Sequence, residues 1–323
     1  MKTTVRLVAA AAALLCASPL LAQTAYPTHP VRMIVPFAAG GPTDVIARVV
    51  AQKLSESLRQ QFYVENLPGA GGNTGTATAA KSPPDGYTVL VVSTGFIVNP
   101  SLYAKGVPYD PVKNFAPVTL VAASPNVLTV NPNVAAKNVQ ELIALAKASP
   151  GKFSFAQPAT GSTPHLNGEL FKLAFRLDLT MVPFTGAAPA ITSTIGGHTP
   201  IAFTALPPAM TNIKDGKLRA LAVLSVKRSP AIPDVPTAAE AGIPGHEGDT
   251  LTGIVVPAGT PNEIVDRLNG EIKNLVALPD VKEKLETLGF DPVADTPAEF
   301  GERIRSETVK WSKVIDDTKI KID

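Results

Sequence analysis

An alternation of apolar strands and amphipathic helices runs along this chain and limits the folds that it can adopt. The first unit is an apolar run at residues 31–37, followed by a Gly-Gly turn and a helix. The apolar side chains of that helix recur at helical spacing: Ile46, Val49, Val50, Leu54 and Leu58. Further strand-like runs lie at 88–92, 127–130, 218–226 and 253–257. This alternation predicts an α/β fold with mostly parallel sheets.

The length of 323 residues is enough for two ordinary domains, each with its own core. We find no internal repeat and no low-complexity linker, so we expect extended strands to join the domains. Proline-rich points at Ser124–Pro125 and around Pro244 are the expected crossings. The predicted first domain is therefore discontinuous, residues 26–124 plus 248–323, and the second domain, residues 125–247, is inserted into it.

The N-terminus has the pattern of a secretory signal peptide. Lys2 and Arg6 precede a Leu/Ala-rich run that is too short to anchor the mature protein in a membrane. We expect residues 1–22 to be removed on export, with a mature start near Gln23 or Tyr26.

The composition of the expected mature chain excludes several classes of function. The one cysteine, Cys16, lies in the leader, which excludes disulfides, thiolate metal sites and a cysteine nucleophile. Removal of Lys2 and Arg6 leaves 27 basic residues against 27 acidic ones. A chain this close to neutral is not expected to bind nucleic acid or an anionic membrane surface.

Residue patterns of common metal, cofactor and enzyme sites do not occur in the sequence. The four histidines are scattered without metal-ligand spacing: His29, His165, His198 and His246. No H-E-x-x-H, P-loop or G-x-S-x-G motif is found. Residues 68–75 resemble a dinucleotide-binding loop, but Thr74 occupies the third glycine position, so we interpret them as a tight turn where two backbones pass closely. We expect no metal and no cofactor.

Two segments combine a buried strand, a small-residue loop and a helix start. Such loops present unpaired N–H groups at the positive end of a helix dipole, and these ends bind anions. In the first segment, residues 36–44, Gly40 and Gly41 allow a ligand to approach the backbone, and Thr43 or Asp44 can cap the helix. An ordinary βα turn explains the same residues, so this segment alone does not establish a site.

The second segment covers residues 158–171. Its residues Ser162 and Thr163 offer hydroxyl and N–H donors, and His165 could add a donor to a carboxylate oxygen. The simpler alternative is that one hydroxyl caps the helix and that His165 is solvated. A periplasmic hydrolase or isomerase is a second alternative, with Ser162 as nucleophile and His165 as general base, but no third group that orients the histidine is evident.

The chain resembles a known family along essentially its whole expected mature length. The matching segments are, in order, PFAAGGPTD, ENLPGAGGNTG, PPDGYTVL, NPSLY, NVQELIALAKASPGK, TGSTPHLNGELF, VPFTGAAPA, GKLRALAV and VPAGTP. They are similar to those of the extracytoplasmic receptors of the tripartite tricarboxylate transporter system, the Bug proteins. The resemblance implies two Rossmann-like α/β domains of the periplasmic binding protein type II-like class, with the ligand in the cleft between them.

The same resemblance implies a function and partners. The protein would be a periplasmic receptor, not an enzyme, that closes over a small carboxylate and delivers it to the membrane subunits of the transporter. A monomer is sufficient for this mechanism. Presentation of the bound form to a sensor kinase would use the same closure, so the sequence does not separate these two outputs.

The resemblance also assigns ligand-binding residues. The first segment would contribute Phe37, Gly40, Gly41, Thr43 and Asp44. The second would contribute Ser162, Thr163 and His165, and Ser93 and Thr94 would line the floor. Thr160, in the same loop, is a further candidate for ligand binding. Binding would use backbone groups, hydroxyls and bridging water.

Two departures from the family pattern bear on the ligand. Phe184 stands where a tyrosine is usual, and Thr204 replaces a frequent aspartate; a common aromatic is also missing at Leu251. These changes predict a less polar far end of the pocket and a dicarboxylate with an apolar body, such as terephthalate. The alternative is that Phe184 only packs against a helix and that Thr204 satisfies a neighbouring backbone group.

Overall fold

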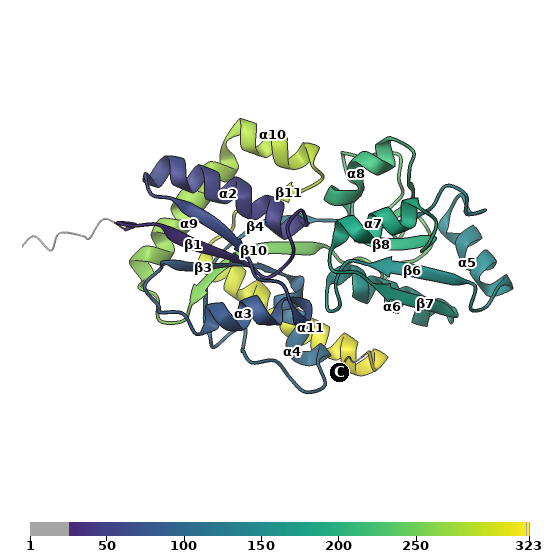
Figure 1. Cartoon of the computed structure of the whole chain (residues 1–323), viewed down its shortest axis with the longest axis horizontal. Coiled ribbons are helices and arrows are strands. Elements are labelled where there is room, and N and C mark those ends of the chain that lie inside the picture. The colour runs from purple at the N-terminus through teal and green to yellow at the C-terminus, as the bar shows by residue number, and fades with distance from the viewer. Residues whose placement is uncertain (1–25, 321, 323) are drawn as a thin grey trace, which may run out of the picture.

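Two β-sheets, each covered by helices, form two lobes that lie side by side (Figure 1). The computed structural model describes residues 26–320 and 322. The predicted signal peptide, residues 1–22, and Cys16 lie outside the described residues. Within the described part of the chain, no helix is both long enough and apolar enough to span a membrane.

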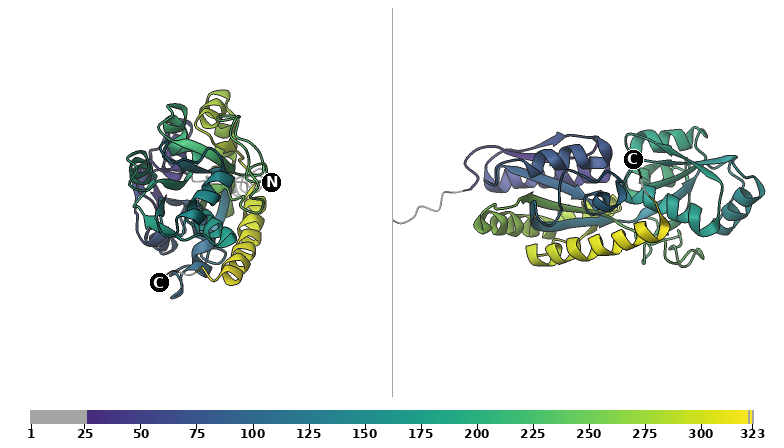
Figure 2. Two further views of the ribbon diagram at one scale, coloured as in Figure 1. Left: turned by 90° about the vertical axis from the view of Figure 1, so that its right-hand side faces the viewer. Right: turned by 90° about the horizontal axis from the view of Figure 1, so that it is seen from below.

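The first lobe contains a six-stranded sheet. Its strands are, in spatial order, β11 (Asp291–Pro292), β4 (Phe115–Ser124), β10 (Thr250–Pro257), β3 (Thr88–Ser93), β1 (Val31–Val35) and β2 (Phe62–Asn66). The helices of this lobe are η1 (Ala70–Gly72), α2 (Pro42–Leu58), α3 (Asn73–Ala80), α4 (Thr94–Leu102), α9 (Asn262–Ala277), α10 (Pro279–Thr287) and α11 (Pro297–Thr318). The long helix α11 runs beneath this lobe and reaches the junction with the other (Figure 2).

The second lobe contains a five-stranded sheet. Its strands are, in spatial order, β7 (Leu179–Pro183), β6 (Phe153–Gln157), β8 (Ile201–Ala205), β5 (Asn126–Val130) and β9 (Arg219–Leu224). Its helices are α5 (Val139–Ala148), α6 (Thr163–Phe175), α7 (Ala187–Ile195) and α8 (Leu206–Lys214). The α/β class with two domains is therefore confirmed.

The prediction of mostly parallel sheets is wrong, because both sheets are mixed. In the first sheet, β1 pairs in parallel with β2 and β3, but β10 is antiparallel to both β3 and β4. In the second sheet, β6 is parallel to β7 and β8, whereas β5 is antiparallel to β8 and β9. The chain crosses between the lobes before β5 and again before β10. A strand that arrives from the other lobe enters its sheet from the opposite end and therefore runs antiparallel to its neighbours. The alternation of strands and helices along the sequence does not indicate this reversal.

The two crossings lie against each other. Pro125 alone separates β4 from β5, and residues 225–249 connect β9 to β10. The side-chain amide of Asn126 donates to the carbonyl of Gly248 at 2.6 Å, and the Thr250 hydroxyl donates to Oδ1 of Asn126 at 3.0 Å. The strands of the first sheet come from residues 31–124 and 250–292, which is compatible with the predicted domain boundaries; those boundaries stay a prediction.

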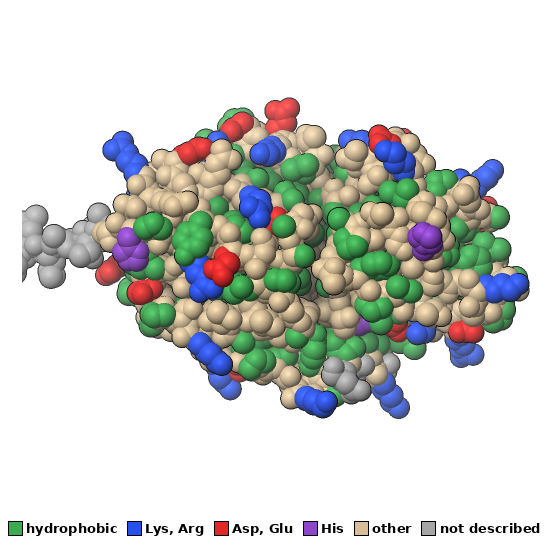
Figure 3. All heavy atoms as spheres, viewed as in Figure 1, with side chains coloured by type: hydrophobic (Ala, Val, Ile, Leu, Met, Phe, Trp, Pro, Cys, Tyr) green, Lys and Arg blue, Asp and Glu red, His purple; other side chains and the backbone are tan. Residues whose placement is uncertain are grey.

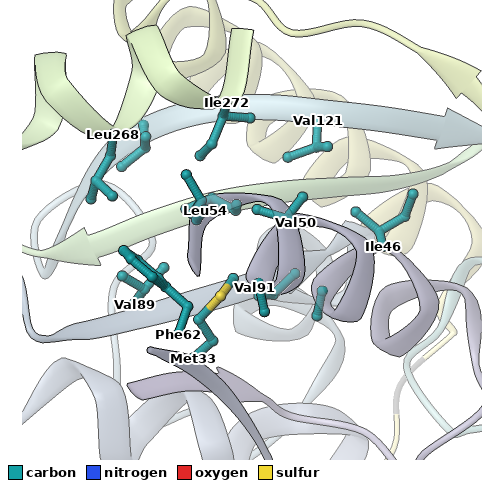
Figure 4. Packing of buried hydrophobic residues seen from close by; sticks show 14 of the residues in the cluster. Met33, Ile46, Val50, Leu54, Phe62, Val89, Val91, Val121, Leu268 and Ile272 are labelled. Atoms are coloured by element: carbon teal, nitrogen blue, oxygen red, sulfur yellow. The ribbon is translucent and has the colours of Figure 1, made fainter. Parts of the chain in front are cut away.

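The core of the first lobe explains why α2 forms where the sequence predicts it. Ile46, Val50 and Leu54 are fully buried and point from α2 onto the sheet (Figure 4). Val49 and Leu58 are only partly buried, at the edges of the same stripe. Leu268 and Ile272 of α9 complete this layer. The stripe orients α2 so that its N-terminus lies at the junction of the two lobes (Figure 1).

Candidate ligand-binding site

A cavity lies between the lobes, where strands β1, β3, β6, β7 and β8 end. Its volume is about 70 Å³, room for roughly five water molecules by the usual minimum per water, and so for a small organic ligand. It is lined by Phe37, Ala38, Gly41, Pro42, Thr43, Ser93, Pro158, Ala159, Ser162, Thr163, Pro164, Thr185, Gly186, Ala187, Ala205 and Thr250. The carboxyl ends of strands are the usual location of ligand sites in open α/β sheets.

Five helices point their N-termini at this cavity. The residues that cap them all line it: Gly41 of α2, Ser93 of α4, Ser162 of α6, Gly186 of α7 and Ala205 of α8. Each helix N-terminus carries a partial positive charge of roughly half an elementary charge. The cavity is therefore electropositive without any cationic side chain.

The five N-termini differ in the N–H groups that they leave free. The Ser93 and Ser162 hydroxyls accept from N–H groups of their own helices, whereas Gly41 and Gly186 have no side chain that could do so. In α8, the Leu206 N–H donates to the carbonyl of Pro125, and the next two residues are prolines. The first turns of α2 and α7 therefore present N–H groups that no capping side chain occupies, although Pro42 at the start of α2 has none to offer.

The walls of the cavity are uncharged. Among the described residues that line it, none carries a charge, and Phe37, Pro42, Pro158 and Pro164 give it a largely apolar lining. Charges of both signs are instead scattered over the outer surface (Figure 3). The described residues also contain no group of three or more His, Cys, Asp or Glu that could hold a metal ion.

The first predicted segment reaches the cavity only in part. Phe37, Gly41 and Thr43 line it, whereas Gly40 and Asp44 do not. The buried Asp44 carboxylate instead accepts from the Gly40 N–H, from Nε of Arg48 and from the Asn66 amide, each at 2.9 Å. Burial alone would raise the pKa of Asp44, but these hydrogen bonds outweigh burial and hold the pKa below its ordinary value. Asp44 is thus placed to hold the loop in shape.

The second predicted segment is divided in the same way. Ser162 and Thr163 line the cavity, and Oγ1 of Thr163 is buried without a hydrogen-bond partner among the described residues, so it is available to a ligand. Thr160 lies outside this cavity, in an adjoining chamber. The ring of His165 lies behind the loop, where Nδ1 accepts the Gly161 N–H at 3.2 Å. The alternative in which His165 is solvated is wrong, since the residue is only 2% exposed, and its predicted contact with a ligand stays a prediction.

The remaining predicted residues have mixed positions. Ser93 lines the cavity, but the buried Thr94 hydroxyl accepts from the Leu251 N–H at 2.9 Å and ties α4 to β10. Phe184 packs on Ala156, Ala190 and Ala202 and borders the adjoining chamber. Thr204 is fully buried, and its hydroxyl has no partner among the described residues. Neither Phe184 nor Thr204 lines the cavity itself, and their expected effect on the choice of ligand stays a prediction.

Sequence reasoning missed the contributions of α7, α8 and β10 to the cavity. These residues are Thr185, Gly186, Ala187, Ala205 and Thr250. Residues 185–189 read T-G-A-A-P, a glycine before a helix start with proline in the first turn, which is the same signal that identified the first segment. Ala205 and Thr250 carry no such signal, because their position depends on how the lobes meet.

Comparison with known proteins agrees with this geometry. Residues 46–320 match the family described as tripartite tricarboxylate transporter family receptor. The chain belongs to this receptor family. The protein BugT of Bordetella pertussis is 39% identical over 312 residues, which cover 95% of this chain and 94% of BugT.

Two solved structures of this receptor class carry ligands. A protein of R. palustris with adipate has a TM-score of 0.88 and 34% identity, with 91% of this chain and 98% of that one covered. MatC of Rhodopseudomonas palustris with bound malate has a TM-score of 0.85 and 31% identity, with 90% and 100% covered. The tripartite tricarboxylate receptors are periplasmic binding proteins, and this chain shares their two-domain fold.

The chain is a receptor of this class and not an enzyme. The contacts of Ser162 and His165 are consistent with that. The Ser162 hydroxyl donates to the carbonyl of Ala159 at 2.6 Å, and Nδ1 of His165 is occupied by the Gly161 N–H. Burial, and secondarily the charge of Lys172, lowers the pKa of His165 to about 4. The ring is therefore neutral at ordinary pH, with its proton on Nε2.

This receptor should lose stability in acid because of His165. The unfolded chain takes up a proton on this ring below pH 6.5, but the folded chain refuses it down to about pH 4. The free energy of unfolding is therefore expected to fall as the pH is lowered through this window, by roughly 3 kcal/mol at 1.36 kcal/mol per pKa unit. Urea denaturation at pH 7 and pH 4.5 measures the change.

The control is His165→Asn, whose amide oxygen can still accept the Gly161 N–H. This variant should lose less stability than the parent over the same pH interval, because it has no ring to protonate. An equal loss in parent and variant would show that other groups cause the acid sensitivity.

Proposed function

We propose that this receptor captures a small dicarboxylate with an apolar body in the cavity between its lobes and delivers it to the membrane subunits of a tripartite tricarboxylate transporter. The convergence of five helix N-termini on one uncharged cavity carries this proposal. An anion there would be stabilised by helix dipoles and backbone N–H groups without an arginine.

The lining supports a ligand with charged ends and an apolar middle. Free N–H groups lie at the first turns of α2 and α7, on opposite lobes, so a carboxylate could be held from each side. The Thr43 and Thr163 hydroxyls would add donors. Phe37, Pro42 and Pro158 would cover the hydrocarbon part by apolar contact. The relatives with bound adipate and malate hold dicarboxylates, which favours the same ligand class here.

Further parts of the proposal concern location and assembly. We propose that residues 1–22 direct export to the periplasm, where the family acts, and that the receptor works as a monomer. The cavity lies within one chain, between its own two lobes, so a second copy is not needed to complete it.

A thermal-shift panel tests the ligand class. The panel contains malate, adipate and terephthalate, with the neutral diamide of adipate as matched control. A ligand present at a hundred times its dissociation constant adds about 2.7 kcal/mol to the free energy of unfolding. We expect stabilisation by at least one dicarboxylate and none by the diamide, with the ligand recovered unchanged. Equal stabilisation by adipate and its diamide would contradict the anion site.

A further inference from the structure

The two lobes also meet beside the cavity through a contact made almost entirely of backbone, which we call the glycine seam. It consists of Gly71, Gly95 and Asn99 from the first lobe and Thr160 and Gly161 from the second. A Cβ atom added to Gly71 would overlap the carbonyl oxygen of Thr160. A Cβ added to Gly95 would lie 3.2 Å from the carbonyl oxygen of Gly161, closer than such atoms normally approach.

The seam depends on how the lobes are placed relative to each other. None of its residues belongs to the crossings at Pro125 and at residues 225–249, so the chain itself does not hold them together. The seam also borders the ligand cleft, because Gly71 and Thr160 line the chamber that adjoins the cavity. Any movement that separates the lobes on this side would therefore open the seam.

The side chain of Asn99 is buried in the seam and leaves one polar atom without a hydrogen bond. Its residue is 1% exposed, and its side-chain N–H groups donate to the carbonyl of Gly71 at 3.0 Å and to Oδ1 of Asn73 at 2.8 Å. Oδ1 of Asn99 faces Gly161, where an added Cβ would overlap it, and has no donor among the described residues. A buried acceptor without a donor is unfavourable relative to one that water can reach. The unpaired Oδ1 of Asn99 therefore opposes closure of the seam.

On the second lobe, the backbone at Gly161 has a conformation that suits this contact. Gly161 has φ +83°, in the left-handed region that favours glycine, and the His165 ring accepts its N–H. His165 thereby fixes the loop that presents the Gly161 carbonyl to α4. Gly95 differs from Gly161, since its φ lies outside the left-handed region and alanine is allowed there on conformational grounds.

We propose that Gly95 is a closure-determining residue: the missing side chain at this position lets the Gly161 carbonyl reach α4, and this approach sets the population of the closed form. A methyl group at position 95 would act as a wedge that disfavours the closed form while leaving each lobe intact. The expected effect on affinity rests on the proposed function, because apparent affinity falls with the population of the binding-competent form. The expected effect on the distance between the lobes does not rest on the proposed function.

The experiment measures the distance between the lobes directly. Nitroxide labels are placed on cysteines at the exposed positions Gln52 of α2 and Thr192 of α7, in a full chain with Cys16→Ser. These two helices lie on either side of the junction (Figure 1). Distance distributions are recorded by electron–electron double resonance, with and without adipate, for the parent, Gly95→Ala and Gly95→Val. Gly270→Ala is the matched control, since a Cβ there meets nothing within 4 Å on the surface of α9.

We expect Gly95→Ala to reduce the fraction of the short distance, Gly95→Val to reduce it further, and Gly270→Ala to match the parent. The dissociation constant for adipate should rise about tenfold in Gly95→Ala. Distributions that are identical for parent and Gly95→Ala, both without ligand and at saturation, would overturn the proposal. If adipate does not bind the parent, only the choice of ligand is wrong. The distances are then measured with a panel ligand that stabilises the receptor. If no panel ligand does so, the distances in the free protein decide on the proposal. If Gly95→Val does not fold, Gly95→Ala alone decides.

Discussion

Replacing Ala38 by glutamate is expected to weaken the binding of adipate about a hundredfold. Ala38 lines the cavity from the loop after β1, is partly exposed, and lies close to Gly186 at the N-terminus of α7. A carboxylate at this position would oppose the anion and occupy the positive helix ends itself. Two like charges about 4 Å apart repel by up to roughly 4 kcal/mol near a protein surface, and a hundredfold loss corresponds to about 2.7 kcal/mol.

Ala38→Gln separates charge from size in this test. Glutamine fills the same volume without the charge, so we expect its dissociation constant to rise by no more than about tenfold. Isothermal titration calorimetry of parent, Ala38→Glu and Ala38→Gln with adipate provides the comparison, with thermal unfolding as a check on folding. Equal losses for Glu and Gln would mean that space, and not charge, governs this end of the cavity, and the anion-binding proposal would lose its main support.

Replacing Gly253 by alanine is expected to lower the free energy of unfolding by about 2–3 kcal/mol, although alanine is usually tolerated better than glycine in a strand. Gly253 lies on β10, which pairs with β3 on one side and β4 on the other. A methyl group there would overlap the ring of Phe300 on α11, which is 1% exposed. Neither the strand nor the buried ring can move away without disturbing the core.

A double-mutant cycle with Phe300→Leu tests this explanation. The shorter leucine side chain removes the ring edge that the new methyl group would meet, so the double variant should lose less stability than the sum of the single variants. Gly270→Ala again serves as control and should be neutral or slightly stabilising, because it improves helix propensity in open space. Urea denaturation gives the free energies of unfolding of the parent, the two single variants, the double variant and Gly270→Ala. If the losses in the free energy of unfolding are strictly additive, contact with Phe300 is not the cause of the destabilisation.

Several features of the receptor could be predicted from local sequence because they depend on neighbouring residues. Strands β1, β3 and β10 and helix α2 follow from hydrophobic periodicity, and the loops before α2 and α6 follow from glycine, proline and hydroxyl residues at a helix start. The interpretation of residues 68–75 as a close backbone approach also agrees with the structure, where Gly71 meets Thr160. These patterns need no knowledge of distant contacts.

Other features depended on contacts between distant parts of the chain. Asp44 was expected to grip the ligand, but Asn66, 22 residues away, and Arg48 on the next turn of α2 occupy its carboxylate. Phe184 and Thr204 were expected in the pocket, yet the neighbouring residues Thr185 and Ala205 line it instead. Thr204 and Ala205 are adjacent residues of β8, where successive side chains face opposite sides of the sheet, so only one of the two can face the cavity.

The α/β class, the family resemblance and the two loops that begin helices at the site could be inferred from the residues alone, because these features reside in short-range patterns. The antiparallel placement of β5 and β10 and the meeting of five helix N-termini at one cavity follow only from the folded arrangement. The support that His165 gives to a loop from behind follows from it as well. The physical reason is that these properties arise from the packing of two lobes joined by crossing strands, and no local pattern records which surfaces that packing brings together.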